Sequence, residues 1–204
     1  MKTYLKYTIL IGCCLLLSGT LFGQSTTELP LISGCNVNGI SLTTLQVDPV
    51  VSLVGDTVNY TVTIANSAAA NVCNARITNG TLTKPDGSVE TLVFPGFPYT
   101  FYLAPGDSIT ANAVAFTTVA AGNNVATGFL DADAQQDVAG TPTYVNADDT
   151  KDITHIVLST GITITKECTS APVQPGDPVT VGGEVCNTGT ATLNDVTIVD
   201  VYPG

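Results

Sequence analysis

The stretch GDTVNYTVTIANS, residues 55–67, shows the pattern on which the whole chain is built. Apolar side chains occupy every second position from Val58 to Ile64, with Asn and Thr between them. Such alternation predicts a β-strand with one buried face and one exposed face. Gly55-Asp56 before the run and Asn66-Ser67 after it are turn residues, so the strand is bounded at both ends.

Similar short runs recur along the chain, separated by turn residues such as Pro85-Asp86-Gly87. We expect further strands over residues 40–47, 72–79, 89–94, 99–103, 108–117, 124–131 and 152–158. Short strands at this spacing predict an all-β fold, an immunoglobulin-like antiparallel β-sandwich over residues 40–158. The composition agrees, because Thr and Val favour strands and disordered chains usually carry more charge than the 11% found here.

The pattern of residues 55–67 returns 121 residues later without gaps. Gly55-Asp56 aligns with Gly176-Asp177, and the apolar face and the terminating Asn coincide. The aligned pairs are Val58 with Val179, Tyr60 with Val181, Ile64 with Val185, Asn66 with Asn187, Val72 with Leu193 and Ile77 with Ile198, against one mismatch, Val62 with Gly183. The sequence therefore predicts tandem repeats, with residues 159–161 as the linker.

The second repeat, residues 162–204, is predicted to be incomplete. Gly204 corresponds to Thr83, just past the third strand of the first repeat. A partial sandwich cannot close its core and leaves strand edges unpaired. We expect the chain to be a fragment of a longer protein, and the alternative is that residues 162–204 dock elsewhere.

The N-terminus resembles a targeting segment. Lys2 and Lys6 precede an almost wholly apolar run over residues 7–17, and small or weakly polar residues follow to Gly23. This order predicts a secretory signal peptide, residues 1–23, followed by an N-terminal extension over residues 24–39. The alternative is a lipobox, Leu10-Ile11-Gly12-Cys13, whose cysteine would be lipidated.

The charge of the mature chain excludes several partners. Loss of Lys2 and Lys6 would leave four cations against 17 acids, a formal net charge of −13. Such a surface repels nucleic acid and has no polybasic patch for a membrane. It suits solubility, divalent cations or a saline exterior.

Four cysteines remain outside the signal, and in an oxidising compartment they allow three pairings. Cys168 and Cys186 end the first two strands of the second repeat. If those strands pair antiparallel around Pro175-Gly176-Asp177, we expect a Cys168–Cys186 disulfide. The remaining bridge would be Cys35–Cys73, which attaches the N-terminal extension to the first repeat. No spacing typical of a zinc site is present.

Acidic residues flank the segment between the last two strands of the first repeat: Asp131, Asp133, Asp137, Asp148, Asp149 and Asp152. The plain interpretation is a solvated acidic loop, because the residue order of an EF-hand is missing. Calcium bridging by these carboxylates is the alternative.

Aromatic residues cluster around Pro95 and Pro98: Phe94, Phe97, Tyr99, Phe101 and Tyr102. We expect them to pack in the core, because the repeat has few other large side chains. An exposed face that stacks on glycans is the alternative.

Nothing in the sequence predicts catalysis or a cofactor. The single histidine, His155, lies in an alternating strand, where we expect it to point outward. No Ser/His/Asp arrangement is evident, and the glycines mark turns rather than phosphate-binding loops. We expect a protein that is not an enzyme.

Three segments resemble, in order, the blocks of the conserved repeat domain of bacterial surface proteins known as domain of unknown function eleven. They are VDPVVSLVGDTVNYTVTIANSAAANV, LAPGDSITANAVAF and NNVATGFLDAD with NADDTKDITHIVLS. Residues 162–204 are similar to the first half of another copy. Departures are Ala65 and Ala68, where the second copy has Cys186 and Gly189.

The resemblance covers roughly residues 40–204 and implies a secreted or cell-surface stalk or spacer without catalytic residues. Its partners would be neighbouring repeats of the same chain. The alternative function is an adhesive module that binds a glycan or a protein, with calcium assistance.

Overall fold

The computed structural model describes residues 24–97, 100–168, 171–172, 174–201 of the chain. Strands make up 57% of the structure, and the described residues contain no helix. The predicted signal peptide lies outside the described residues. In sequence order the strands are β1 Ile40–Asp48, β2 Val51–Leu53, β3 Thr57–Asn66, β4 Asn74–Thr83, β5 Val89–Thr91, β6 Phe101–Leu103, β7 Ser108–Thr110, β8 Val114–Thr117, β9 Gly122–Val138, β10 Thr141–Asn146, β11 Asp149–Leu158, β12 Ile162–Cys168 and β13 Val181–Asn187.

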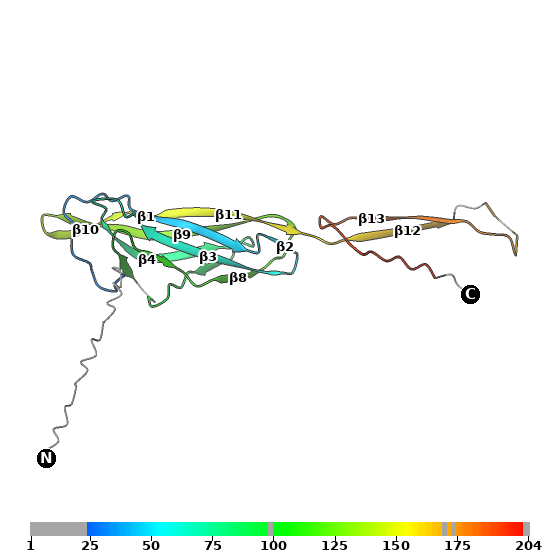
Figure 1. Cartoon of the computed structure of the whole chain (residues 1–204), viewed down its shortest axis with the longest axis horizontal. Coiled ribbons are helices and arrows are strands. Elements are labelled where there is room, and N and C mark those ends of the chain that lie inside the picture. Colours follow the sequence, from blue (N-terminus) through cyan, green and yellow to red (C-terminus); the bar gives the residue numbers. More distant parts are fainter. Residues whose placement is uncertain (1–23, 98–99, 169–170, 173, 202–204) are drawn as a thin grey trace, which may run out of the picture.

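The first eleven strands form one unit of two sheets (Figure 1). One sheet has the order β1-β3-β7, and β8 also pairs with β3. The other has the order β2-β11-β9-β4-β5, with β10 on β9 and β6 on β4. Every pairing is antiparallel except that of β2 with β11.

The core of this unit lies between the two sheets. Val58, Tyr60, Val62 and Ile64 of β3 are at most 1% exposed, which confirms the face predicted from their alternation. They belong to one cluster with apolar residues of the opposite sheet, among them Ile77, Leu82, Phe101, Leu103 and Leu130. Each fully buried side chain of this size contributes roughly 1.5–3 kcal/mol to folding.

Strand boundaries differ from the sequence prediction in several places, and the differences at β7–β8 and at β9 are among the largest. The predicted strand 108–117 is two strands, β7 and β8, which both pair with β3. The ladder is interrupted because Asn112 donates its backbone N–H to Val93 and not to β3, and residues 111–113 face only residues 61–62. The predicted strand 124–131 is the longer β9, which continues into a hairpin with β10. β10 was missed because its residues are only half-buried or exposed and so lack a clear apolar face.

Asn66, the last residue of β3, ties the two sheets together. Its side-chain Nδ2 donates to the carbonyl oxygens of Cys73 and Leu103, at 2.9 and 3.0 Å. Its backbone also donates to Asp107 and accepts from Gly106. The side chain is 2% exposed, so these bonds satisfy carbonyls that have no access to water.

Three turns share one construction, with a glycine in the left-handed region followed by an aspartate. The glycines are Gly55, Gly106 and Gly176, with φ of 96°, 90° and 97°. In each turn the aspartate carboxylate accepts the backbone N–H three residues earlier, and the aspartate N–H donates back to that residue's carbonyl. The pairs are Leu53 with Asp56, Ala104 with Asp107 and Gln174 with Asp177. Glycine is required because other residues rarely adopt this φ.

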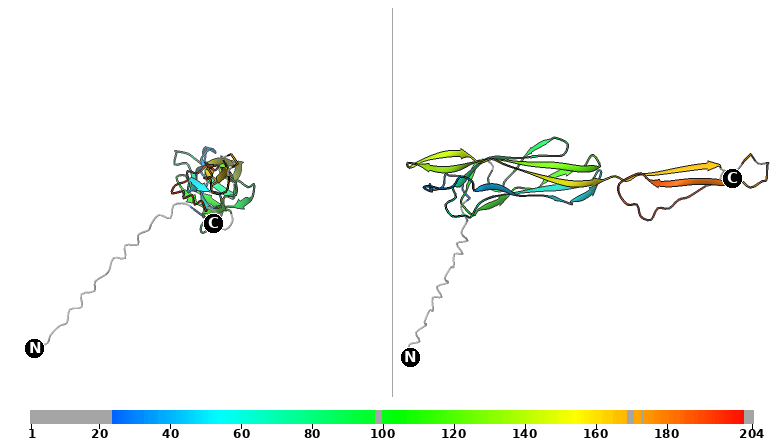
Figure 2. Two further views of the ribbon diagram at one scale, coloured as in Figure 1. Left: turned by 90° about the vertical axis from the view of Figure 1, so that its right-hand side faces the viewer. Right: turned by 90° about the horizontal axis from the view of Figure 1, so that it is seen from above.

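The last two strands form a separate two-stranded ribbon, β12–β13. From Thr44 onward its register matches that of β1–β3 at the offset of 121 residues, since Leu45 pairs with Val62 and Lys166 pairs with Gly183; before the bulge in β1 the two registers differ by one residue. The burial does not repeat: every residue of β12 is exposed. The ribbon lies in line with the first unit along the long axis of the molecule (Figures 1 and 2).

The N-terminal extension packs along the first unit rather than extending away from it. A disulfide joins Cys35 to Cys73, which are 6% and 2% exposed. Isolated bridges pair Ser25 with Tyr102 and Asn36 with Val72. Because the disulfide closes a separation of 38 residues, the chain-entropy model assigns it about 4 kcal/mol of stability.

We predict that replacing both Cys35 and Cys73 by Ser lowers the free energy of unfolding by about 3–4 kcal/mol. The loss arises mainly because the unfolded chain regains conformational freedom. Denaturant titration of the oxidised proteins measures it. A Cys168→Ser variant is the control, because it leaves the Cys35–Cys73 bridge intact. A double variant as stable as the wild type would contradict this role of the bridge.

Candidate functional site

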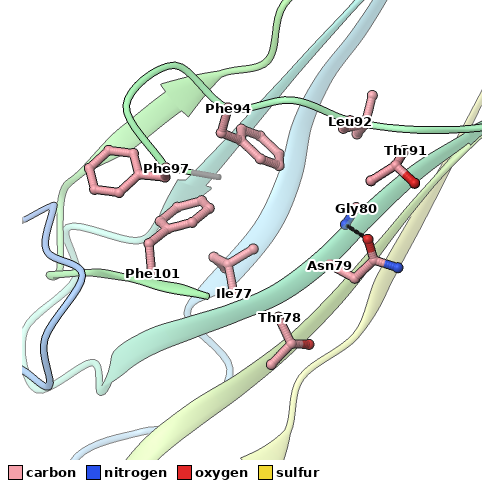
Figure 3. Close-up of a pocket in the computed structure, with 9 residues that line it drawn as sticks. All are labelled: Ile77, Thr78, Asn79, Gly80, Thr91, Leu92, Phe94, Phe97 and Phe101. Carbon is pink, nitrogen blue, oxygen red and sulfur yellow. Dashed lines mark hydrogen bonds between the residues drawn. The ribbon is translucent and has the colours of Figure 1, made fainter. Parts of the chain in front are cut away.

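The aromatic cluster surrounds a small cavity at the edge of the core (Figure 3). The rings of Phe94 and Phe97 lie 5.3 and 4.9 Å from the ring of Phe101, measured between centroids. Phe94 and Phe101 are at most 4% exposed, and Tyr102 is also buried. These rings pack in the core, as the sequence predicted; Tyr99 lies outside the described residues.

The alternative hypothesis requires an exposed aromatic face, and the described rings form only a small cavity instead. Its volume is about 60 Å³, whereas typical ligand pockets measure roughly 300–1,000 Å³. Gly80 forms part of the wall, and a Cβ there would meet Leu92 and Phe94 at 3.2 and 3.3 Å. Asn79 turns its side-chain oxygen back to the N–H of Gly80, as Figure 3 shows.

The six aspartates do not line a loop, because β10 occupies the segment between β9 and β11. Five of the six carboxylates have separate partners: Asp133 binds Arg76, Asp137 accepts from Gly140, Asp148 from Ala132, Asp149 from Leu42 and Asp152 from Thr127. Within the part of the chain that the structure describes, no three His, Cys, Asp or Glu side chains converge in a way that could hold a metal ion. The acids here bind backbone and neighbouring side chains.

One polar cluster of the first unit was missed by the sequence analysis. Arg76 donates from Nε to Asp133 at 3.0 Å, and its guanidinium lies 3.6 Å from the centroid of the Tyr144 ring. The Tyr144 hydroxyl donates to Glu28 of the N-terminal extension. The cluster therefore joins β4, β9, β10 and the extension. The one available signal was Arg76 itself, the only arginine of the chain.

The electrostatics of this cluster suit a structural role. Burial acts to lower the pKa of Arg76, but the hydrogen bond and the charge of Asp133 outweigh it and raise that pKa. Burial and the hydrogen bond to Glu28 raise the pKa of Tyr144 well above its usual value. Neither Arg76 nor Tyr144 therefore changes its protonation near neutral pH.

His155 points into the core, so the expectation that it faces outward was wrong. It is 0% exposed, and its Nδ1 lies 3.0 Å from the hydroxyl oxygen of Tyr60. Both faces of β11 carry apolar residues here, and Ile156, not His155, lies on the exposed face. The Tyr60 hydroxyl makes the inward choice possible, because it supplies a hydrogen bond to a ring that has left water.

Burial sets the protonation of this pair. It lowers the pKa of His155 and raises the pKa of Tyr60 to about 12. Both groups are therefore neutral at pH 7. Nε2 of His155 has no hydrogen-bond partner among the described residues, and no carboxylate hydrogen-bonds to the ring as the third member of a catalytic triad would.

The predicted Cys168–Cys186 disulfide does not form in the ribbon. In the observed register Cys168 lies opposite Val181, and Cys186 lies opposite Thr163. The C-terminal ends of two consecutive antiparallel strands lie at opposite ends of the hairpin, here about 17 Å apart at ~3.3 Å per residue. A disulfide needs Cα atoms within roughly 7 Å. A hydrogen bond with Glu184 raises the pKa of the Cys186 thiol, which disfavours its reactive thiolate.

Comparisons with known proteins add little. No protein-family model matches the chain, and no curated protein matches it. A solved structure described as "AvmM Catalyzes Macrocyclization in Alchivemycin A Biosynthesis" is similar at a TM-score of 0.26 and 10% identity, over 57% of this chain and 90% of that one. The resemblance to surface-protein repeats therefore stays a prediction. Over the described residues, no helix is long and apolar enough to cross a membrane.

We predict that the first unit loses stability as the pH falls from 7 to 5. The folded pKa of His155 lies below the unfolded value of about 6.5, so the unfolded chain binds a proton first. The stability that comes from the neutral, buried His155 is complete above pH ~6.5. Below that pH the free energy of unfolding falls by up to about 1.4 kcal/mol per pH unit. Denaturant titrations at pH 7.5, 6.0 and 5.0 measure the loss.

A His155→Gln variant is the control for this pH dependence. It keeps a polar side chain beside Tyr60 but does not titrate, and no other histidine exists in the chain. The variant should be less stable at pH 7.5 yet show a flatter profile between pH 7 and 5. An equally steep profile in the variant would assign the acid sensitivity to other groups.

Proposed function

We propose that this chain is a non-catalytic structural segment of a secreted or cell-surface protein, in which immunoglobulin-like repeats act as a stalk or spacer. The observation that carries the proposal is the junction between the two units. A spacer must keep its length and direction. Its linkers must therefore be short and must be fixed by hydrogen bonds to the units on both sides.

The linker, residues 159–161, is bound to the second unit by backbone and side-chain hydrogen bonds. Ser159 donates its N–H to the Thr190 hydroxyl and accepts from the N–H of Thr190 and Ala191, all at 2.9 Å. Gly161 accepts from Thr188 at 3.0 Å. These four hydrogen bonds fix the linker to the second unit. On the other side, Val54 donates its N–H to Leu158, the residue before the linker, at 2.9 Å.

Gly189 allows the loop to approach the linker this closely. A Cβ at this position would lie 2.4 Å from the carbonyl oxygen of Ser159 and 2.7 Å from the N of Gly161. Its counterpart in the first unit is Ala68, at the same offset of 121 residues. Because Ala68 is exposed, its position in the first unit has room for a side chain. The difference between the two units fits a glycine needed at a junction.

The similarity of the two units supports repetition of one module. From Thr44 onward the ladder of β12–β13 has the same residue offset as that of β1–β3, and the turns at Gly55-Asp56 and Gly176-Asp177 have the same hydrogen bonds. The resemblance to the repeat domain of bacterial surface proteins points to the same function. The adhesive alternative has less support, because the described rings of the cluster around Pro95 pack in or against the core and five of the six carboxylates have separate partners.

We predict that the chain behaves in solution as a stiff rod, and that Gly189→Ala and Thr190→Val loosen it. The first substitution forces the loop off Ser159, and the second removes the hydroxyl that accepts from Ser159. Small-angle X-ray scattering should show a broader pair-distance distribution in both variants. Thr192→Val, at an exposed residue of the same loop, is the matched control.

A further variant shows what a flexible junction gives in the same scattering measurement. Four residues, Gly-Ser-Gly-Ser, inserted after Thr160 give a flexible linker. If the wild-type chain already scatters like this insertion variant, the junction is flexible and the spacer proposal loses its main support.

We predict that the chain leaves the cytoplasm and that cleavage after Gly23 makes Gln24 the first residue. Expression with residues 1–23 in a bacterial host, followed by intact mass measurement, tests this. A Cys13→Ala variant should be exported equally well. Loss of membrane-bound product in that variant would instead assign Cys13 as a lipidation site.

A further inference from the structure

The buried histidine of the first unit lies close to the linker in the chain. His155 belongs to β11, which ends at Leu158, immediately before the linker of residues 159–161. Its ring is 0% exposed, and Nε2 has no hydrogen-bond partner among the described residues. A protonated imidazole has an N–H on each ring nitrogen, so Nε2 would then need an acceptor. His155 can therefore take up a proton favourably only where its ring reaches water.

The elements packed around His155 offer no charge to balance an imidazolium. β3 presents the neutral hydroxyl of Tyr60, and β9 presents the uncharged Asn124, which lies opposite His155 in the ladder. β2 contains no charged residue. The charged residues of β1, β9 and β11 are exposed or half-buried: Asp48, Asp131, Asp133, Asp137, Asp149, Lys151 and Asp152. A proton on His155 in the closed unit would thus be a buried, unpaired charge, which is unfavourable.

The edge strand β2 is the element that separates from β11 most easily. It has three residues and, within the described part of the chain, pairs only with β11. Of these residues only Ser52 is buried, and its hydroxyl has no hydrogen-bond partner. A buried hydroxyl without a partner costs free energy, and a serine buries little apolar surface. β9, on the other side of β11, pairs with it over nine residues and is held more firmly.

The pairing of β2 with β11 also fixes the first unit's side of the junction. Val54 donates its N–H to Leu158 at 2.9 Å, and Ile156 donates to Val50 at 3.1 Å. In Figure 1, β2 lies at the end of the first unit from which the chain passes to β12. Separation of β2 would release Leu158, while the hydrogen bonds of Ser159 to the second unit would remain.

We propose that uptake of a proton by His155 detaches β2 from β11, so that mildly acidic solution loosens the junction between the two units. The proton binds Nε2, and water that enters beside β11 accepts from the new N–H. The many acids of the chain favour the open state, because they attract the new cation once it is hydrated. This inference rests on the spacer function proposed above and adds a response to pH.

The direction and size of the response follow from proton linkage. Burial lowers the pKa of His155 in the closed unit, whereas an imidazole in water has a pKa of about 6.5. The open state therefore binds the proton first, and opening becomes more favourable as the pH falls through about 6.5. Between pH 7.5 and 5.0 the opening equilibrium constant should rise roughly tenfold to thirtyfold.

Amide hydrogen exchange at pH 7.5 and 5.0, corrected for the intrinsic effect of pH on exchange, measures this opening. The amides of Val54 and Ile156 report on β2, because their hydrogen bonds join it to β11. Their exchange should accelerate by the factor given above, while the amides of β4 change much less. His155→Gln should abolish the response, and Thr154→Gln, at the exposed neighbouring position, should keep it.

Ser52→Ala tests the same site with His155 in place. The substitution removes the hydroxyl that has no partner, so β2 should pair more firmly with β11. Exchange at Val54 and Ile156 should slow roughly threefold or more at both pH values. Unchanged exchange in this variant would contradict the role given to β2.

Small-angle X-ray scattering at both pH values separates this inference from the spacer function. A chain that is stiff at pH 7.5 and bends at pH 5.0 only when His155 is present supports the inference. A chain that is stiff at both values overturns it and leaves the spacer function intact. A chain that is flexible already at pH 7.5 overturns the spacer function together with its response to pH. Equal acceleration of exchange in β4 also overturns the inference, because acid would then unfold the whole unit.

Discussion

A pair of strands with one apolar face requires a second layer, and this constraint governs both units of the chain. In the first unit the face of β3 lies against β4, β6 and β9, and its four apolar residues are almost completely buried. In the second unit the same ladder exists, but the corresponding face is open. The difference shows that strand pairing alone does not make a core; the opposite sheet does.

Polar side chains join the layers where apolar packing would leave backbone groups without partners. Asn66 donates to two carbonyls of the opposite sheet at one end of the core. Tyr60 and His155 form a hydrogen bond across the middle of the first unit, from β3 to β11. An unmade hydrogen bond in the interior costs more free energy than a made one contributes, so such pairs specify a single arrangement of the sheets.

The sequence predicted correctly those features that depend on a single periodicity of apolar residues. The buried face of β3 follows from period-two alternation, and Asn66 continues the same parity, which was a usable signal for its burial. The prediction failed where apolar residues lie on both faces of a strand, or where the interacting residue is distant in the sequence. His155 lies in a strand with apolar residues on both faces. Arg76 and Glu28 meet through Tyr144 of β10, a strand that lacks an apolar face.

The cysteines also show that a local pattern does not determine which residues meet in space. That Cys168 and Cys186 end successive strands could be inferred from the alternation, but a hairpin places those two ends apart, and the register separates the Cys168–Val181 and Thr163–Cys186 pairs by five positions. The order of strands, their periodicity and the offset of 121 residues were determined by the sequence itself, because they are local patterns. Which face is covered, how His155 is oriented and how Gly189 fits against the linker were decided only by the tertiary structure, because each depends on atoms from a distant part of the chain.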